Sequence, residues 1–492
     1  MRKYILAMAL VTAIGILIQS GCSGPGHLGT QHTVPAAGTL AVFGGDAPLC
    51  NVISFTVTIT GLTLTPQSGS SPVSVLPSGT AVTVDFASLM DFASMFSLSS
   101  VSPGTYSSLG ITLSNPQLTY LDTSTTPSSF KTIVPSMTTL TVNLDFNPAI
   151  TVAIAGSLAL QLDFNLLNSV ALGPSNQFTV TPTFTANVAS ASGGNSLAQF
   201  DDLSGLVQSV NTSATNPSFA GSFTISSPDA QTFTVNITNS SSFTGVSGLS
   251  GLTAGTFVEM SAFLDTNANI VATTVVAEAQ EDAASGEAAF AGLITSVTPQ
   301  SGNATQFTLL VQEESPDVNS RVALFSLLTV NISPSSTTFG LASPAANFAN
   351  FPFGPSNLAV GQRVVVHGTL PSGSGVAQSA TARSIFVGLQ SILGNLSTNP
   401  STPVNVATDG VDGGFTLVPC SPLFQATPVT VLASQSTTYE GIAGLSSLTS
   451  PGAHFLLVKG LLFYEQSDTT YGVESWPVPA NVQVATEVHQ LP

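Results

Sequence analysis

The stretch Phe55-Thr56-Val57-Thr58-Ile59-Thr60 decides the fold class of the first part of the chain. Large apolar side chains occupy its odd positions and Thr occupies every even position. In an extended strand, one face therefore packs into a core while the other meets water. Further strand patterns, bounded by turn residues, cover residues 82–86, 109–113, 140–146, 158–166 and 178–188. Their length and spacing predict an all-β architecture that begins with a β-sandwich over residues 37–190.

Residues 85–96 are the exception to this strand pattern. They read Asp-Phe-Ala-Ser-Leu-Met and then Asp-Phe-Ala-Ser-Met-Phe, with apolar residues at helical spacing. This pattern predicts a short helix that caps the sandwich, with Asp85 as its N-cap.

Several short motifs of the sandwich region are typical of one bacterial family. They are Gly38-Thr39-Leu40, Asp46-Ala47-Pro48, Thr60-Gly61-Leu62, Pro103-Gly104-Thr105-Tyr106 and Leu162-Asp163-Phe164-Asn165. On these motifs, residues 37–190 resemble the family known as domain of unknown function 4382. The resemblance implies a secreted or lipid-anchored β-sandwich module without an assigned activity.

The second half of the chain repeats itself after a predicted linker at residues 190–199. Each unit has an apolar opening strand, a strand that begins with Thr-Val, and a turn that leads into a further strand. The turns are Leu252-Thr253-Ala254-Gly255, Leu358-Ala359-Val360-Gly361 and Leu448-Thr449-Ser450-Pro451-Gly452. In such a turn Leu fills the core and Gly lets the backbone reverse with positive φ. We predict three small β-barrel-like repeats, over residues 200–282, 288–387 and 388–492.

These units resemble the bacterial domain of unknown function 5666, the first unit most closely and the third least. The resemblance implies small barrels comparable with oligonucleotide/oligosaccharide-binding barrels. Such a fold alone is no argument for a function.

Charge limits the classes of ligand. Of 492 residues only 7% are charged, with 7 Lys and Arg against 25 Asp and Glu, for a formal net charge of −18. Binding to a phosphate backbone depends on Lys and Arg contacts, so we exclude nucleic acid as a partner. The composition also excludes a coiled coil or a long helical array.

The N-terminus predicts export and lipid anchoring. Met1-Arg2-Lys3 precedes an apolar run over residues 4–18, which is short for a membrane span and typical of a signal peptide over residues 1–21. Ser20-Gly21-Cys22 resembles the lipobox of bacterial lipoproteins, which implies acylation of Cys22. An ordinary secretory signal is the alternative. Residues 22–36 are predicted to be a flexible tether, and we expect the protein on the extracytoplasmic side of the cell envelope, at the outer membrane.

Two further cysteines, Cys50 and Cys420, remain after Cys22. Disulfides persist in an oxidising compartment, so a bond between them is one interpretation. Their separation of 370 residues, in different predicted domains, favours two separate thiols instead. The sequence has no CxxC or Cys/His cluster, and we predict neither a metal site nor a cofactor.

No spacing of residues indicates a catalytic site. The sequence has no nucleophile elbow, zinc-protease motif or phosphate-binding loop, and His367 and His454 are predicted as surface residues of barrel strands. Adjacent acids such as Glu313-Glu314 are interpreted as parts of solvated turns. Asp409-Gly410-Val411-Asp412-Gly413-Gly414 faintly resembles a calcium loop but is predicted to be a hairpin turn.

Aromatic residues near the C-terminus offer one candidate ligand site. Tyr464, Tyr471 and Trp476 lie close together in the sequence, as in surfaces that bind sugars, although packing of the last strands is the favoured interpretation. We predict a non-enzymatic, lipid-anchored envelope protein that acts as a binding or structural module. The alternative is a carbohydrate-binding or polysaccharide-handling lipoprotein, and an envelope protein is a further partner.

Overall fold

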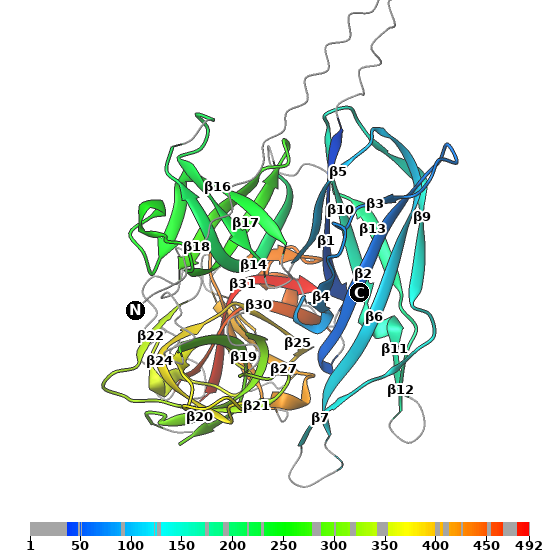
Figure 1. Ribbon diagram of the computed structural model, residues 1–492. Helices are drawn as coiled ribbons and strands as arrows, with labels where there is room; N and C mark the ends of the chain where they lie inside the picture. The colour runs from blue at the N-terminus through cyan, green and yellow to red at the C-terminus, as the bar shows by residue number, and fades with distance from the viewer. Residues whose placement is uncertain are drawn as a thin grey trace, which may run out of the picture. The chain divides into compact units, whose positions relative to one another are not determined.

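The structure is a computed structural model of the chain, and it describes most of residues 37–491. The segments outside this description are 1–36, 48–49, 51, 90–93, 123, 125–128, 173–176, 190–195, 214–215, 228–230, 278–286, 300–301, 315–320, 342–352, 399–403, 407–412, 425–426, 450–453, 466–479 and 492. The described residues belong to one compact unit, Ala36–Pro492. Strands make up nearly all of its regular structure (Figure 1), which confirms the all-β prediction.

Two packed β-sheets form the predicted sandwich. The first has the order β13-β10-β1-β5, with β1 parallel to β10 and the other neighbours antiparallel. Its strands are β1 (Gly38–Ala47), β5 (Ser94–Val101), β10 (Ser157–Asn165) and β13 (Phe184–Val188). The second consists of β2 (Val52–Pro66), β3 (Val73–Ser74), β4 (Val82–Asp85), β6 (Gly104–Asp122), β7 (Ser129–Ile133) and β9 (Thr141–Val152). A third, small sheet contains β8 (Ser136–Met137), β11 (Val170–Leu172) and β12 (Phe178–Val180).

Phenylalanine rings join the two large sheets. Phe55 of β2 stacks on Phe164 of β10 with ring centroids 5.4 Å apart. Phe164 also stacks on Phe86 at 4.6 Å and meets Phe184 of β13 edge-on at 4.8 Å. The apolar residues of the Phe55–Thr60 alternation are fully buried, so this face of β2 forms the core as predicted.

The predicted helix over residues 85–96 is wrong at its C-terminal end. Among the described residues of this stretch, Phe86–Leu89 form a 3₁₀ turn, η1, and residues from Ser94 onward belong to β5. Met95 and Phe96 explain the difference, because they pack into different hydrophobic clusters on opposite faces of a strand. Asp85 does cap η1, since its Oδ1 accepts the backbone N–H of Ala87 at 3.1 Å.

Two predicted boundaries also change. Residues 178–188 form two strands, β12 and β13, because Pro182 between them has no N–H for a strand ladder. A short helix, α1 (Leu166–Ser169), lies between β10 and β11. Residues 196–199 were predicted as linker but begin strand β14, in which Phe200 pairs with Ala262.

The first repeat is a closed five-stranded barrel with the order β14-β15-β16-β18-β17. Neighbouring strands are antiparallel except for the parallel pair β16–β18. This is the strand order of the oligonucleotide/oligosaccharide-binding barrel. The strands are β14 (Ser196–Asn211), β15 (Gly221–Ser226), β16 (Thr232–Thr244), β17 (Phe257–Asp265) and β18 (Ile270–Ala277).

The second and third repeats have the same strand order. The parallel pairs β21–β24 and β28–β31 correspond to β16–β18, and β22 and β29 continue the third strand of each barrel. The second barrel contains β19 (Glu287–Thr298), β20 (Gln306–Glu314), β21 (Leu327–Asn331), β22 (Thr338–Leu341), β23 (Arg363–Thr369) and β24 (Ser379–Val387). The third contains β25 (Gln390–Leu396), β26 (Asn405–Val406), β27 (Gly413–Pro419), β28 (Val429–Ala433), β29 (Thr438–Glu440), β30 (Phe455–Glu465) and β31 (Ala480–Gln490). Single 3₁₀ turns are η3 (Leu249–Gly251), η5 (Pro355–Asn357), η6 (Pro422–Phe424) and η7 (Leu445–Thr449).

The Leu-x-x-Gly turns have the predicted backbone. Gly255 and Gly361 have φ of 86° and 85°, a region that favours glycine. At Gly361 a second constraint applies, because a Cβ there would lie 2.6 Å from the ring of Phe424 in the third barrel. The corresponding turn of the third repeat lies partly outside the described residues.

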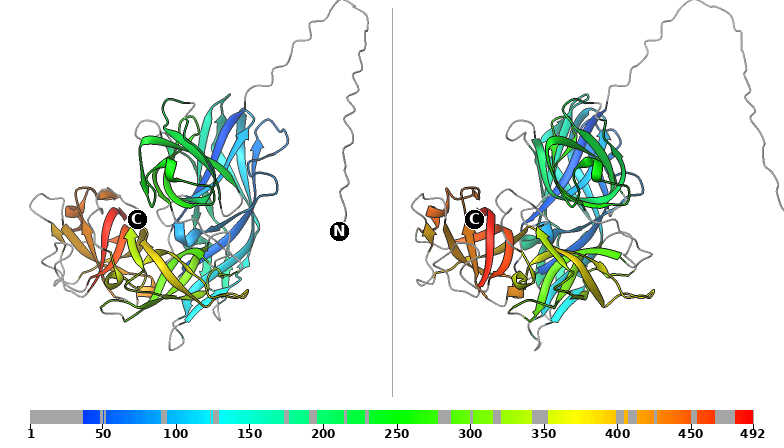
Figure 2. Two further views of the ribbon diagram at one scale, coloured as in Figure 1. Left: turned by 60° about the vertical axis from the view of Figure 1, so that its left-hand side comes forward. Right: turned by 90° about the vertical axis from the view of Figure 1, so that its left-hand side faces the viewer.

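The first barrel packs against the outer face of the sandwich. Phe43 of β1 meets Phe200 of β14 edge-on, with ring centroids 5.7 Å apart. The Nε2 of Gln231, a buried side chain, donates to the backbone oxygen of Phe96 at 3.1 Å. Figure 2 shows the green strands of this barrel beside the blue strands of the sandwich.

Buried amide side chains join the second barrel to the third. Gln362, which is completely buried, donates through Nε2 to the backbone oxygen of Leu462 in β30 at 2.5 Å. Gln390 of β25 reaches back, since its Oε1 accepts the N–H of Arg363 at 2.6 Å and its Nε2 donates to Gly361 at 2.7 Å. These contacts make the two barrels one packed body rather than separate modules on a string.

Candidate functional site

A disulfide joins the beginning of the sandwich to the third barrel. Cys50 precedes β2, Cys420 follows β27, and their Cα atoms are 5.2 Å apart. The interpretation of two separate thiols is therefore wrong. Separation along the sequence misleads here, because the third barrel folds back onto the sandwich. Ile53 of β2 belongs to the same buried cluster as Phe415 and Leu417 of β27.

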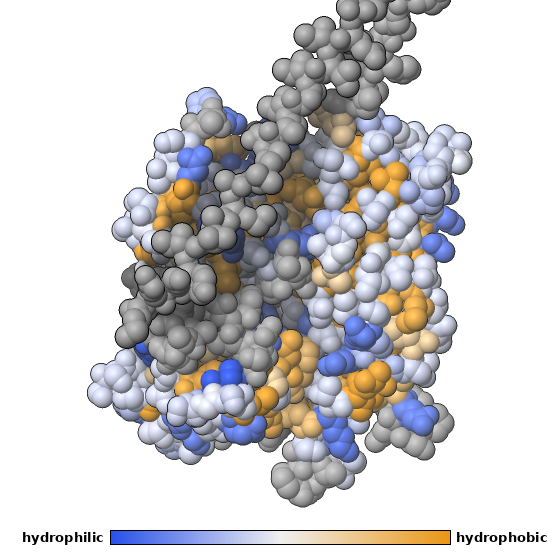
Figure 3. Space-filling view, in the orientation of Figure 1, coloured by the Kyte–Doolittle hydropathy of each residue, from blue (hydrophilic) through white to orange (hydrophobic). Residues whose placement is uncertain are grey.

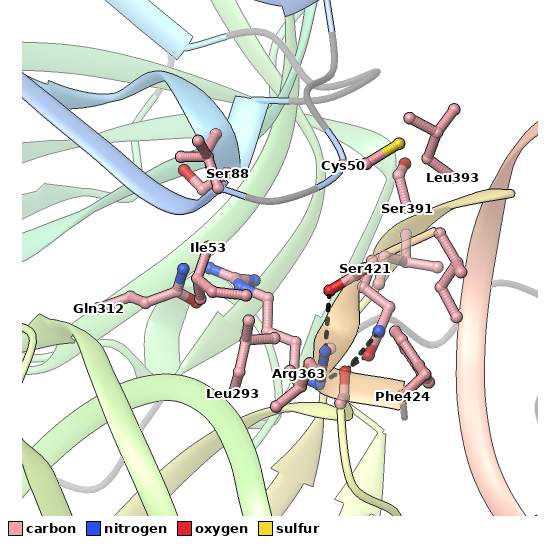
Figure 4. A pocket seen from close by; sticks show the side chains of 18 of the residues that line it. Cys50, Ile53, Ser88, Leu293, Gln312, Arg363, Ser391, Leu393, Ser421 and Phe424 are labelled. Carbon is pink, nitrogen blue, oxygen red and sulfur yellow. Dashed lines mark hydrogen bonds between the residues drawn. The ribbon is translucent and has the colours of Figure 1, made fainter. Parts of the chain in front are cut away.

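A cavity of about 140 Å³ lies beside this disulfide, and we call it the disulfide cavity. Its walls come from the sandwich and all three barrels, and many of its side chains are apolar, including Ile53, Leu293 and Phe424 (Figure 4). Arg363 of β23 and Gln312 of β20 are among its polar groups. A cavity of this volume is comparable with one that holds a single benzene-sized molecule.

A larger cavity of about 370 Å³, which we call the acidic cavity, shares wall residues with the first. Four carboxylates from three domains line it: Asp85 of the sandwich, Glu259 of the first barrel, and Glu313 and Glu314 of the second barrel. This convergence is unusual in a chain in which only 7% of residues are charged.

The acidic cavity changes the ionisation of two of these carboxyls. Burial raises the pKa of Asp85 to about 6, although hydrogen bonds from Ser54, Phe55 and Ala87 act in the opposite direction, and the charge of Glu313 raises it further. Burial also raises the pKa of Glu314 to about 7. Its Oε2 atom is buried and has no hydrogen-bond partner among the residues that the structure describes.

Arg363 neutralises one member of the cluster. Its Nη2 lies 2.7 Å from Oε1 of Glu313, in a partly buried ion pair between β23 and β20. The prediction that Glu313 and Glu314 lie in a solvated turn is wrong, because both residues belong to strand β20.

The residues singled out from the sequence are placed only in part. Cys22, Tyr471 and Trp476 lie outside the described residues. Tyr464 lies in β30, where its half-buried side chain packs against the core of the third barrel, as in the packing interpretation.

The described part of the chain offers no metal site: no three His, Cys, Asp or Glu side chains gather there as ligands. Asn165 caps α1 by accepting the N–H of Asn168 at 2.9 Å. Asp46 lies in β1. Residues 407–412 of the calcium-like segment lie outside the description, but Val406 and Gly413 on either side pair antiparallel, as in a hairpin.

The histidines differ from the prediction at one position. His367 of β23 is only 6% exposed, so it is not a surface imidazole. Its ring meets Phe386 edge-on at 6.0 Å. His454 precedes β30, and its Nδ1 lies 2.8 Å from Oε1 of Gln490. Within the described residues, no helix is long and apolar enough to span a bilayer.

The fold defines a class: an all-β multidomain protein in which a β-sandwich and three small barrels share one disulfide-linked body. Residues 37–182 match the family described as domain of unknown function (DUF4382). Residues 204–276 match the family described as domain of unknown function (DUF5666). The resemblances of the sandwich and of the first repeat are confirmed, in the predicted order along the chain.

Other comparisons add little about function. No curated protein matches the sequence. Among solved structures, Drosophila Unr CSD456 is similar at 12% identity and a TM-score of 0.15, over 59% of this chain and 97% of that chain. A deletion mutant of the single-stranded DNA binding protein from Thermus aquaticus is similar at 14% identity and a TM-score of 0.14, over 42% and 94%. Likenesses this weak carry no argument.

Proposed function

We propose that this chain is a non-enzymatic lipoprotein of the bacterial cell envelope, held at the outer membrane by an acylated Cys22. Its sandwich and barrels act as one rigid binding or structural module at the end of a tether over residues 22–36. The observation that carries the proposal is the bond between Cys50 and Cys420, at a sequence separation of 370 residues, which joins the sandwich to the third barrel. Such a bond belongs to a protein that matures in an oxidising compartment.

The interfaces between domains support rigidity as part of the function. A flexible series of domains would expose the polar groups at its domain boundaries to water. Here the amides of Gln231, Gln362 and Gln390 are buried and bonded across those boundaries. A buried amide that loses its partner is costly, so these contacts favour a single arrangement of the domains.

Surface charge indicates the kind of partner. Loss of Arg2 and Lys3 with the signal peptide would take the formal net charge from −18 to −20. The face in Figure 3 shows few strongly hydrophilic residues among polar and apolar ones. We therefore propose uncharged envelope components or envelope proteins as partners, and not nucleic acid or an anionic lipid surface. Binding of polysaccharide near Trp476 is the alternative function.

Acylation of Cys22 can be tested directly. We would express the full chain and its Cys22→Ser variant in a bacterium fed a labelled fatty acid, and then separate membranes from the soluble extracytoplasmic fraction. We expect label and membrane association for the wild type and for a Ser23→Ala control, and neither for Cys22→Ser. Membrane association of an unlabelled wild-type chain would contradict the proposal.

A further inference from the structure

The acidic cavity gathers carboxylates at the meeting point of three domains. Asp85 ends β4 of the sandwich, Glu259 lies in β17 of the first barrel, and Glu313 and Glu314 end β20 of the second barrel. Any motion that separates the domains would carry these groups apart and admit water between them.

The charged groups around the cavity do not balance. When ionised, the four carboxylates carry four negative charges, and Arg363 beside Glu313 supplies one positive charge. His367 lies two residues beyond the wall residue Val365 in β23, next to the cavity wall and not in it. Like charges held close together in a partly buried site repel one another, so protonation of some of these acids stabilises the arrangement.

We propose that the acidic cavity is a pH-controlled latch, in which protonated Asp85 and Glu314 hold the sandwich and the first two barrels together and their ionisation loosens this junction. The groups are suited to the task in different ways. Asp85 lies on the sandwich side of the cavity, where its Oδ1 accepts a hydrogen bond from the N–H of Phe55 at 2.8 Å. Glu314 lies on the side of the second barrel, where its buried Oε2 has no hydrogen-bond partner among the described residues.

The direction of the pH effect follows from the raised pKa values. Both carboxyls hold a proton more tightly in the closed structure than in water, with pKa values of about 6 for Asp85 and about 7 for Glu314. Protonation therefore favours the closed state, and this stabilisation is lost as the pH rises through 6 to 7. The junction should be tight in acid and looser at neutral pH.

The disulfide limits what the latch can do. Cys50 and Cys420 keep the sandwich attached to the third barrel whatever the state of the cavity. Loosening is therefore a local opening of the wall between β4 and β20, and the chain stays compact. Such an opening exposes or hides cavity walls in response to the acidity of the envelope.

Hydrogen exchange of the oxidised full chain tests the latch. Amide protection, corrected for the intrinsic pH dependence of exchange, would be compared at about pH 5 and about pH 8 for β4 with η1 and for β20. We expect wild-type protection in both segments to fall about tenfold or more at the higher pH, a change that a pKa shift of one unit or more produces. Constant wild-type protection would overturn the proposal without any variant.

Neutral variants make the assignment specific. Asn at position 85 keeps an oxygen for the N–H groups of Phe55 and Ala87, so Asp85→Asn should fold. We expect the double variant Asp85→Asn with Glu314→Gln to keep its protection at both pH values, and Glu314→Gln alone to lose part of the dependence. Asp145→Asn, on the exposed side of β9, is the matched control and should behave like the wild type. A double variant with the full wild-type pH dependence would refute the assignment.

Discussion

Replacement of Gln362 by Leu should loosen the third barrel from the second. Leu is close to Gln in volume, so the change removes hydrogen bonds with little loss of packing. The two shortest hydrogen bonds of the Gln362 side chain disappear: the N–H of Ala359 to Oε1 at 3.2 Å, within the second barrel, and Nε2 to the oxygen of Leu462 at 2.5 Å, across the interface. Gln362 is completely buried, so water cannot easily replace either bond.

The magnitude follows from the groups left without partners. A buried polar group without its partner costs about 1–3 kcal/mol, so the oxygen of Leu462 alone should destabilise the interface by that amount. Since 1.4 kcal/mol corresponds to a factor of about ten, local opening should become about five to 150 times more frequent. The loss at Ala359 adds a similar cost within the second barrel.

Hydrogen exchange by mass spectrometry measures this opening in the full chain. We expect faster exchange in β30 (Phe455–Glu465) and unchanged exchange in β14 of the first barrel, which contributes no wall residue to the disulfide cavity that Gly361 lines. Gln208→Leu, at an exposed position of β14, is the matched control and should change neither. If β30 of Gln362→Leu exchanged at the wild-type rate, the buried amide would not join the barrels and the reasoning would be wrong.

Three further substitutions have defined outcomes. Gly361→Ala should destabilise the protein more than Gly79→Ala in thermal unfolding. Both glycines have φ near 80°, which costs alanine about 1–2 kcal/mol, but only at Gly361 would the added Cβ lie 2.6 Å from a ring, that of Phe424. Equal losses would argue against packing of this turn on Phe424. Phe164→Ala should destabilise the sandwich by about 3–5 kcal/mol in urea unfolding because the ring contacts three others, and a loss below 1 kcal/mol would contradict this core. Trp476→Ala should leave sedimentation of the chain with insoluble polysaccharides and cell-wall material unchanged, whereas loss of a saturable binding would favour the carbohydrate alternative.

Local patterns predicted the fold well because strand alternation and turn glycines are local properties. The Thr alternation after Phe55 fixed which face of β2 is buried, and the Leu-x-x-Gly spacing located the positive φ of Gly255 and Gly361. The helical prediction for residues 85–96 failed for a different reason. Met95 and Phe96 pack on opposite sides of one strand, and the neighbour that buries Met95 is a barrel more than a hundred residues away.

Contacts between domains were beyond sequence analysis. Nothing near Cys50 or Cys420 indicates that the third barrel returns to the sandwich, and Glu313-Glu314 look like surface residues until β20 is placed opposite Asp85. One signal was present in the composition. This chain has few charged residues, and several of its acids lie within or beside apolar strands. Asp85, for example, directly follows Val82-Thr83-Val84. An acid buried with such a strand needs a partner, because unpaired carboxylates are almost never fully buried.

Peptide mapping without reductant is the most direct test of the central claim, that a disulfide formed in an oxidising compartment joins the four domains in one body. The full chain would be purified from the cell envelope, its free thiols blocked, and its proteolytic peptides identified by mass spectrometry before and after reduction. We predict a linked pair of peptides that contains Cys50 and Cys420 and separates on reduction. Blocked thiols at both positions would contradict the disulfide-closed body, and with it the observation that carries the proposed function.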